Sequence, residues 1–142
     1  MRVAICDDNS EQLEIIQTAA ENYSERHPEL SMQTALYDSP LLFIEEWIKN
    51  GNYDVLLLDI CMPGILGTEI AKEIRQRKES LEIVFVTSTT EFAIEAFTLK
   101  AAHYIVKPFS RGQFDEAMDR AIEKHKNKIV KNIVTIQSRQ RC

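Results

Sequence analysis

The chain has 142 residues, of which 44% are hydrophobic and 27% are charged, so it is long enough for one globular domain with its own core. No apolar run reaches the roughly 20 residues that a membrane-spanning helix needs, and the amino terminus has no signal-peptide pattern. Three widely spaced cysteines match no disulfide or zinc pattern and fit a reducing compartment. We therefore expect a cytoplasmic protein with no membrane contact.

The charge is unevenly distributed along the chain. Residues 1–123 hold all 22 acidic residues and 11 of the 17 lysines and arginines, a formal net charge of −11. Residues 124–142 hold the other six cations and no acid, a net charge of +6. An acidic body argues against nucleic-acid binding by that body. We interpret the basic tail as a solvated helix end and linker.

Strand and helix patterns alternate along the chain. The strands are predicted from short apolar runs, which are typical of buried parallel strands, and the helices from apolar residues at a spacing of three or four. In chain order the predicted elements are a strand at 3–6, a helix at 10–27, a strand at 31–37, a helix at 40–50, a strand at 54–58, a helix at 68–78, a strand at 82–86, a helix ending at 97, a strand at 103–106 and a helix that starts after Ser110.

Helix ends carry recognisable signals. Asn9 or Ser10 can cap the first helix, Ser110 can cap the last, and Ser39 followed by a proline is typical of the start of the second. The second helix ends at Gly51. Pro63, Gly64 and Gly67 are predicted to form a loop before the third helix. The polar cluster at residues 87–90 is predicted to cap the fourth helix.

An unbroken (βα)5 order with short connections predicts an α/β fold, a flavodoxin-like doubly wound parallel sheet with helices on both faces. The expected strand order is 2-1-3-4-5. The pattern changes near the carboxyl terminus. We therefore expect one domain over residues 1–125 and a basic linker over residues 126–142, in which Ile133-Val134-Thr135-Ile136 is interpreted as a short strand.

Polar residues follow four of the five predicted strands, namely Asp7-Asp8, Asp59, Thr87 and Lys107-Pro108. Each signal alone is typical of a turn. In open α/β sheets, however, ligands bind beyond the carboxyl ends of the strands. If the four strands are neighbours, three carboxylates, a hydroxyl and an ammonium group converge on one point. Such a site suits a divalent cation and a phosphoryl group.

The chemistry of these groups is complementary. Magnesium prefers oxygen ligands, which Asp7, Asp8 and Asp59 can supply directly or through water. Asp59 is best placed as a nucleophile, because aspartate carboxylates can form acyl phosphates. Lys107 and the cation would stabilise charge on the equatorial oxygens during transfer, and Thr87 could donate a hydrogen bond to a phosphoryl oxygen.

As a set, these residues resemble the receiver domain of two-component response regulators over residues 1 to about 125. Asp7-Asp8 resembles the acidic pair of that family. Residues 59–67, DICMPGILG, match its D-x-x-M-P-x-x-x-G segment. Thr87 resembles the switch hydroxyl, Tyr104 the switch aromatic residue, and Lys107-Pro108-Phe109 the K-P-F element.

The resemblance implies that Asp59 accepts a phosphoryl group from a sensor histidine kinase, with Mg²⁺ as cofactor. It also implies that Lys107 binds the phosphoryl group while Thr87 moves towards it and Tyr104 rotates inward. A receiver would catalyse only its own phosphorylation and dephosphorylation. The implied Mg²⁺ ligands are Asp7, Asp8, Asp59 and the backbone carbonyl of Cys61.

Two segments, residues 90–97 and 102–109, resemble receivers of LytTR-type transcription regulators, in which a β-rich DNA-binding domain follows the receiver. The resemblance therefore implies an output domain in a longer protein. The first strand of that domain would begin at Ile133–Ile136. It also implies a homodimer through the fourth helix, fifth strand and fifth helix of the (βα)5 order.

Two alternatives remain open from the sequence. The first is a stand-alone receiver that acts through protein contacts. The second is a magnesium-dependent phosphatase with an aspartyl nucleophile, similar to haloacid-dehalogenase-like enzymes. That reading is weaker because Cys61 stands where those enzymes usually place a second acid, and no cap segment for a substrate is present.

Overall fold

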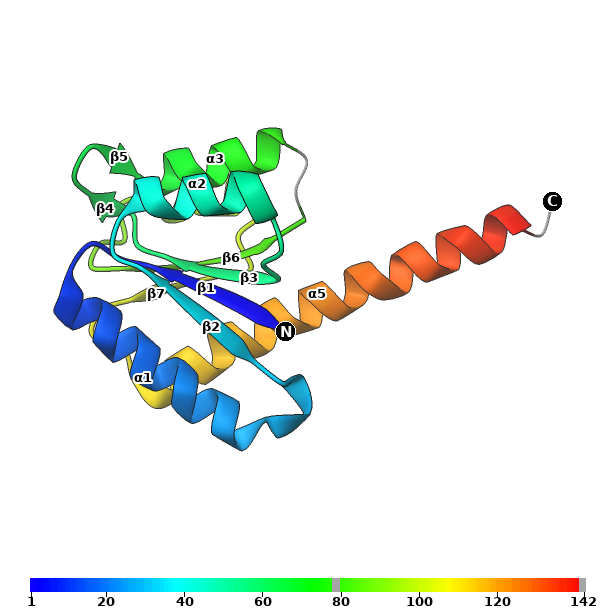
Figure 1. The fold of residues 1–142 in the computed structure, drawn as a ribbon, viewed down its shortest axis with the longest axis horizontal. Coiled ribbons are helices and arrows are strands. Elements are labelled where there is room, and N and C mark those ends of the chain that lie inside the picture. The colour runs from blue at the N-terminus through cyan, green and yellow to red at the C-terminus, as the bar shows by residue number, and fades with distance from the viewer. Residues whose placement is uncertain (78–79, 141–142) are drawn as a thin grey trace.

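The computed structural model describes residues 1–77 and 80–140. Its main sheet has five parallel strands in the order β2-β1-β3-β6-β7, which run through the middle of the domain in Figure 1. The predicted order 2-1-3-4-5 is confirmed, with β6 and β7 as the fourth and fifth strands. The strands are β1 (Arg2–Cys6), β2 (Gln33–Tyr37), β3 (Val55–Leu58), β6 (Glu82–Thr87) and β7 (His103–Val106).

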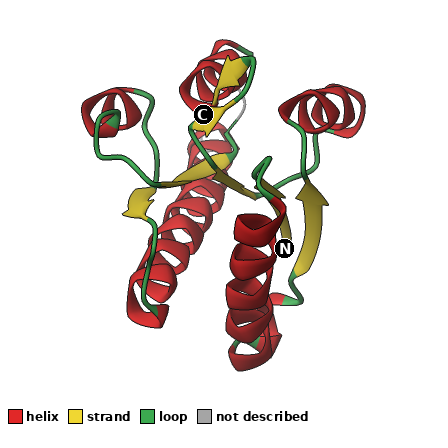
Figure 2. Ribbon diagram, turned by 90° about the vertical axis from the view of Figure 1, so that its left-hand side faces the viewer, coloured by secondary structure: helices red, strands yellow, loops and turns green. Residues whose placement is uncertain are grey.

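Helices cover both faces of the sheet, so the predicted doubly wound α/β architecture is confirmed (Figure 2). Two helices pack on one face and three on the other. The first face carries α1 (Ser10–Arg26) and α5 (Arg111–Gln140), and the second carries α2 (Pro40–Asn50), α3 (Gly67–Gln76) and α4 (Ala93–Thr98). A 3-10 turn, η1 (Pro28–Leu30), connects α1 to β2.

The central strands are buried on both faces, which explains their continuous apolar runs. Alternate residues of β3 point to opposite sides, so that Leu57 packs under α1 and α5 while Leu56 and Leu58 pack under the other helices. The carboxyl ends lie close in register: Cys6 pairs with Leu58 and Leu58 with Phe85, while Thr87, further along β6, pairs with Val106. Residues that follow these strands are therefore neighbours in space.

Three predicted helix caps are confirmed. The Asn9 side chain accepts a hydrogen bond from the backbone N–H of Gln12, and Ser39 caps α2 in the same way. Ser110 and Gln113 form a reciprocal pair in which each side chain accepts from the other's backbone N–H. Gly51 ends α2 in the left-handed conformation (φ 50°).

The predicted cap of the fourth helix is wrong. Thr87 is the last residue of β6, and α4 begins only at Ala93, without a side-chain cap. The Thr89 hydroxyl instead accepts a hydrogen bond from the backbone N–H of Glu91. The polar cluster therefore forms the loop between β6 and α4.

The segment after β3 is more ordered than the predicted loop. It forms a short antiparallel hairpin of β4 (Cys61–Met62) and β5 (Ile65–Leu66). Gly64 lies in its turn at φ 86°, a conformation that favours glycine. The helix predicted over 68–78 is described as α3, which ends at Gln76; the predicted end at Lys78 lies outside the described residues.

The short strand expected at Ile133–Ile136 is also wrong, because these residues belong to α5, which continues to Gln140 and projects beyond the sheet (Figure 1). An apolar run becomes a strand only when a neighbouring strand pairs with its backbone groups, whereas a helix satisfies its own. No described strand lies alongside residues 133–136. Among the described helices, α5 included, none has a stretch long and apolar enough to cross a membrane.

Candidate phosphoryl and metal site

The polar residues predicted to converge do lie at one end of the sheet. Asp7-Asp8 follow β1, Asp59 follows β3, Thr87 ends β6 and Lys107 follows β7. These four strands are consecutive neighbours in the sheet. The backbone N–H of Asp59 donates to the carbonyl of Cys6 at 3.0 Å, and that of Lys107 to the carbonyl of Thr87 at 2.8 Å, so the sheet hydrogen bonding reaches into the site.

Asp7 and Lys107 form the shortest ion pair of the site. Lys107 Nζ lies 2.6 Å from Asp7 Oδ2, and the Asp7 side chain is fully buried. The other oxygen of Asp7 accepts a hydrogen bond from the backbone N–H of Asn9 at 3.0 Å. Asn9 thus caps α1 with its side chain and holds Asp7 with its backbone N–H. The sequence predicted the cap but not the contact with Asp7.

Asp59 is nearly buried, with 6% of its surface exposed, and one of its oxygens, Oδ1, lies 3.7 Å from Lys107 Nζ. The same oxygen accepts a hydrogen bond from the backbone N–H of Ile60 at 2.9 Å. Burial raises the pKa of Asp59 above its ordinary value; Lys107 opposes the rise and Asp7 adds to it. The negative charge of Asp59 is therefore incompletely compensated.

Three carboxylates meet in this place. Asp7, Asp8 and Asp59 each offer an oxygen, and these oxygens lie within 4.8 Å of one another. Asp8 is exposed to solvent, in contrast to the other two. Lys107 is the ammonium group paired with the cluster, so three negative charges face one positive charge. An all-oxygen ligand set with excess negative charge fits a hard divalent cation such as Mg²⁺.

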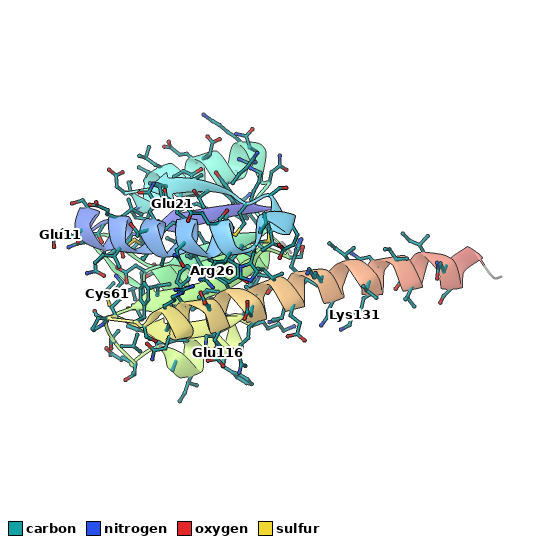
Figure 3. All side chains as sticks on the ribbon, turned by 90° about the horizontal axis from the view of Figure 1, so that it is seen from below. Glu11, Glu21, Arg26, Cys61, Glu116 and Lys131 are labelled. Atoms are coloured by element: carbon teal, nitrogen blue, oxygen red, sulfur yellow. The ribbon has the colours of Figure 1, made fainter. Side chains whose placement is uncertain are left out.

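An open cleft of about 580 Å³ gives access to the carboxylates. We call it the acidic cleft. Besides the cluster and Lys107, its walls include Cys61 from β4, Ser88 from the β6–α4 loop and Phe109 after β7. Figure 3 places Cys61 at the same end of the molecule as Glu11 in the first turn of α1, away from Lys131 on the projecting part of α5.

Neither of the two predicted switch residues lines the cleft. Thr87 is fully buried, and its hydroxyl oxygen has no hydrogen-bond partner among the described residues. Its neighbour Ser88 lines the cleft instead. The Tyr104 hydroxyl donates a hydrogen bond to the backbone carbonyl of Thr89, in the same loop. The loop between β6 and α4 therefore contributes Ser88 to the cleft and is bonded to Tyr104, while the hydroxyl of Thr87, which precedes the loop, is buried.

The two described cysteines differ in environment. Cys61 is exposed, whereas Cys6 is buried at the end of β1. Burial, together with the nearby charges of Asp7 and Asp59, raises the pKa of the Cys6 thiol to about 12. The Cys6 thiol is thus inert packing under the site rather than part of its chemistry.

Gly67 is the last residue of the D-x-x-M-P-x-x-x-G segment. A glycine is required here because the backbone of Asp59 and Ile60 passes very close to its Cα, which the sequence alone did not predict. A Cβ at this position would lie 2.1 Å from the backbone carbonyl oxygen of Asp59 and 2.9 Å from the Cα of Ile60. The backbone N–H of Gly67 donates to the carbonyl of Ile60 at 2.8 Å. The start of α3 is thereby packed directly against the backbone that presents Asp59.

The fold and this site define the class of protein. The sequence profile of the response regulator receiver domain family matches residues 3–119. The chain belongs to this family, and the resemblance seen in the sequence is confirmed.

Curated relatives narrow the resemblance to Lyt-type regulators. The chain is 44% identical over 71 residues to the sensory transduction protein LytT of Oceanobacillus iheyensis; this alignment covers 49% of this chain and 29% of that protein. It is 36% identical over 91 residues to the sensory transduction protein LytR of Staphylococcus epidermidis, covering 60% and 36%. The transcriptional regulatory protein NatR of Bacillus subtilis is 36% identical over 77 residues, covering 54% and 33%. The chain therefore spans about a third of the length of these relatives.

Solved structures share the fold. The response regulatory domain of protein mrkE from Klebsiella pneumoniae superposes with a TM-score of 0.76 at 24% identity, covering 89% of this chain and 99% of that one. The response regulator protein TrrA from Thermotoga maritima, solved in complex with Mg(2+)-BeF, gives a TM-score of 0.67 at 27% identity, covering 84% and 97%.

Proposed function

We propose that this chain is a phosphoacceptor switch in which Asp59 receives a phosphoryl group from a sensor histidine kinase. The observation that carries the proposal is the position of the Asp59 carboxylate, which opens on the acidic cleft between Lys107 and two further carboxylates. Membership of the receiver family supports the same role. The domain then acts on no separate substrate and carries out only its own phosphorylation and dephosphorylation, in the cytoplasm.

The two oxygens of Asp59 have different tasks in this proposal. Oδ1 is held by the N–H of Ile60, whereas Oδ2 accepts no hydrogen bond from the described residues. The freer oxygen attacks phosphorus, the bond from phosphorus to the donor nitrogen of phosphohistidine breaks, and the electron pair leaves with the imidazole. A nearly buried carboxylate whose negative charge is poorly compensated is a suitable nucleophile.

Lys107 contributes a fixed positive charge. Its ammonium group is 10% exposed and lies between Asp7 and Asp59, so it is positioned by the fold before any phosphoryl group arrives. A preorganised cation at the point where negative charge develops lowers the barrier to transfer. After transfer, the same ammonium group can bind a phosphoryl oxygen.

Mg²⁺ is the cofactor that the residues fit. Asp7, Asp8 and Asp59 would hold it, together with the backbone carbonyl of Cys61 that the family resemblance implies. Bound there, Mg²⁺ would supply positive charge that offsets the three carboxylates and the incoming phosphoryl oxygens. The complex of TrrA with Mg(2+)-BeF supports this assignment by analogy.

The buried hydroxyl of Thr87 gives the switch a physical basis. This hydroxyl has no hydrogen-bond partner in the part of the chain that the structure describes, so a phosphoryl oxygen on Asp59 would supply the missing acceptor if the β6–α4 loop moved. Tyr104 is bonded to the same loop through Thr89 and would follow it. We propose that charge on Asp59 biases this loop between two arrangements and thereby moves α4.

The output is proposed from the relatives. Because the Lyt-type relatives are about three times as long as the matched region, we propose that a DNA-binding output domain follows this receiver in a longer regulator. Residues 126–142 then form the connection, of which 141–142 lie outside the described residues. We further propose a homodimer through α4, β7 and α5, since Ile94 and Phe97 of α4 are 85% and 84% exposed.

Intact mass after incubation with acetyl phosphate and Mg²⁺ tests the central step. We expect one phosphoryl adduct on the parent chain and none on Asp59→Asn. The matched control is Asp38→Asn, which removes an exposed aspartate outside the cluster and should leave the adduct unchanged. An adduct on Asp59→Asn, or the absence of one on the parent, would contradict the proposal.

A further inference from the structure

A buried carboxylate lies at the end of the sheet opposite the acidic cleft. Glu82, the first residue of β6, is 0% exposed. Its charge is balanced by two lysines of α5: Lys128 Nζ contacts one oxygen, and Lys124 Nζ lies 3.9 Å from the other. The two carboxylate oxygens have no other hydrogen-bond partner among the described residues. A buried carboxylate held in this way depends on α5 for its compensation.

The same lysines hold the part of α5 that leaves the sheet. Among the residues of α5 whose burial is described, Ile122 is the last buried one, so packing against the sheet ends there. Lys124 and Lys128 are one helical turn apart and therefore lie on one face. Lys128 Nζ also donates to the backbone carbonyl of Ser80 at 2.7 Å. Beyond Ile122, α5 is attached to the body by these polar contacts and by His125, whose Nε2 lies 3.6 Å from Asp54 Oδ1.

The end of α4 reaches the same cluster. Lys100 follows α4 in the left-handed conformation, at φ 58°, and the backbone N–H groups of residues 100 and 101 donate to the carbonyls of residues 97 and 96. This turn leaves the carbonyls of Leu99 and Lys100 without helical partners. Lys124 Nζ donates to the Lys100 carbonyl at 3.3 Å, which is a direct link from α5 to α4.

Arg75 of α3 adds a second link. Its guanidinium donates to the carbonyl of Leu99 at 2.9 Å, to that of Lys100 at 3.4 Å and to that of Leu81 at 2.7 Å. Burial lowers the pKa of Arg75, and the charge of Glu82 opposes that effect. Two cations from two helices, Arg75 and Lys124, thus share the carbonyls that end α4, and Lys124 also lies 3.9 Å from the Glu82 carboxylate.

We propose that Arg75, Glu82, Lys124 and Lys128 form a coupling junction that links the position of the α4 end to the attachment of α5 beyond Ile122. If α4 shifts, the Lys100 carbonyl is withdrawn from Lys124 and Arg75, and the cations that balance Glu82 rearrange. If α5 detaches, Glu82 loses its compensation and the α4 carbonyls lose a donor. Such a linkage is reciprocal, because a coupling free energy acts equally in both directions.

The coupling junction would connect the proposed phosphoryl switch to the part of α5 that leads out of the domain. The loop between β6 and α4 borders the acidic cleft, whereas the junction ties the other end of α4 to the segment that leads out of the domain. A role of the junction in phosphoryl signalling rests on the proposed function. The coupling between α4 and α5 does not depend on that function, and it can be measured without any phosphoryl donor.

Amide hydrogen exchange on the chain of 142 residues tests the coupling. In Lys124→Gln/Lys128→Gln we expect the amides of residues 123–130 to exchange about fivefold faster and those of residues 99–102 about threefold faster, with the central strands unchanged. The matched control is Lys126→Gln/Lys131→Gln, which removes two exposed lysines of the same helix and should change neither segment.

The reciprocal variant is Arg75→Lys, which removes donors to α4 without touching α5. We expect faster exchange not only at residues 99–102 but also at residues 123–130. If the lysine pair affects α5 alone, or if the control pair produces the same changes, the junction does not couple the helices and the proposal is overturned. A failure of acetyl phosphate to modify Asp59 would instead count against the proposed function only.

Discussion

Gly67 lies so close to Asp59 that a Cβ on the glycine would stand 2.1 Å from the Asp59 carbonyl oxygen. The first turn of α3 is therefore packed against the backbone that presents the candidate phosphoacceptor. The phosphoacceptor side chain is held from the other direction by the N–H of Ile60 and by Lys107. Its position consequently depends on backbone packing as well as on charge.

Gly67→Ala should destabilise the fold by about 3 kcal/mol, because the methyl group can be accommodated only by moving the main chain of Asp59 or of α3. Urea denaturation of parent and variant measures the difference. The control is Gly112→Ala on α5, where a Cβ would meet only the Ser110 hydroxyl at 3.9 Å. That change should stabilise the helix by about 0.5 kcal/mol. Equal effects of the two substitutions would contradict the close approach.

Asp59→Asn should stabilise the metal-free protein at pH 7 by about 1 kcal/mol, since burial and Asp7 make the negative charge of Asp59 unfavourable. The pKa of Asp59 is raised above its value of 3.8 in the unfolded chain. The folded state therefore binds this proton more tightly, and the parent loses stability as the pH rises from 3.8 through the raised pKa. The variant lacks this loss.

Urea denaturation in the presence of EDTA, repeated in steps of about one pH unit between about pH 3.5 and 7, measures how the free energy of unfolding depends on pH. The advantage of Asp59→Asn should shrink towards the acid end, where the parent's carboxyl is protonated. Glu21→Gln, at an exposed position on α1, is the control and should show no such trend. An advantage that grows on acidification would mean that Asp59 is stabilised, not destabilised, by its surroundings.

The main features of the fold were predictable from the sequence for a physical reason. Strands buried on both faces must be apolar throughout, so β1, β3 and β6 stand out as short apolar runs. Their carboxyl ends lie at the same edge of the sheet and close in register, which is why residues as distant as Asp7 and Lys107 could be predicted to meet. The charges of the residues that follow the strands, together with the order of the strands along the chain, were sufficient for that prediction.

Other features depend on distances that no local pattern encodes. The need for Gly67 follows from the path of the backbone between Asp59 and α3, and the sequence marked this residue only as part of a motif and a loop. The apolar run at Ile133–Ile136 fits both a strand and a helix, and the outcome depends on which partners are present. The pairing of Glu82 with Lys128 joins positions 46 residues apart along the chain and carries no signal at either.

Thr87→Val should stabilise the protein by about 1 kcal/mol, because it replaces a buried hydroxyl that no described residue hydrogen-bonds with a methyl group of similar size. The same change should uncouple the switch: acetyl phosphate should still modify Asp59, but the exchange of amides in the β6–α4 loop should no longer respond. Thr87→Ser keeps the hydroxyl and is expected to restore the response at some cost in stability. A normal response in Thr87→Val would exclude the hydroxyl from the switch.

Mg²⁺ should stabilise the folded protein, because Asp7, Asp8 and Asp59 bring three carboxylate oxygens within 4.8 Å of one another and the unfolded chain does not. At a concentration ten times the Kd, one bound ion contributes about 1.4 kcal/mol, and EDTA should remove the effect. Thermal denaturation against Mg²⁺ concentration measures it.

Asp8→Asn separates binding from folding in that experiment. Asp8 is the exposed member of the cluster, so its substitution should change the metal-free stability by less than about 0.5 kcal/mol while abolishing most of the stabilisation by Mg²⁺. Glu11→Gln removes an exposed acid at the start of α1, outside the cluster, and should leave the Mg²⁺ response intact. If Asp8→Asn responds to Mg²⁺ as the parent does, the ion binds elsewhere and the carboxylate cluster is not its site.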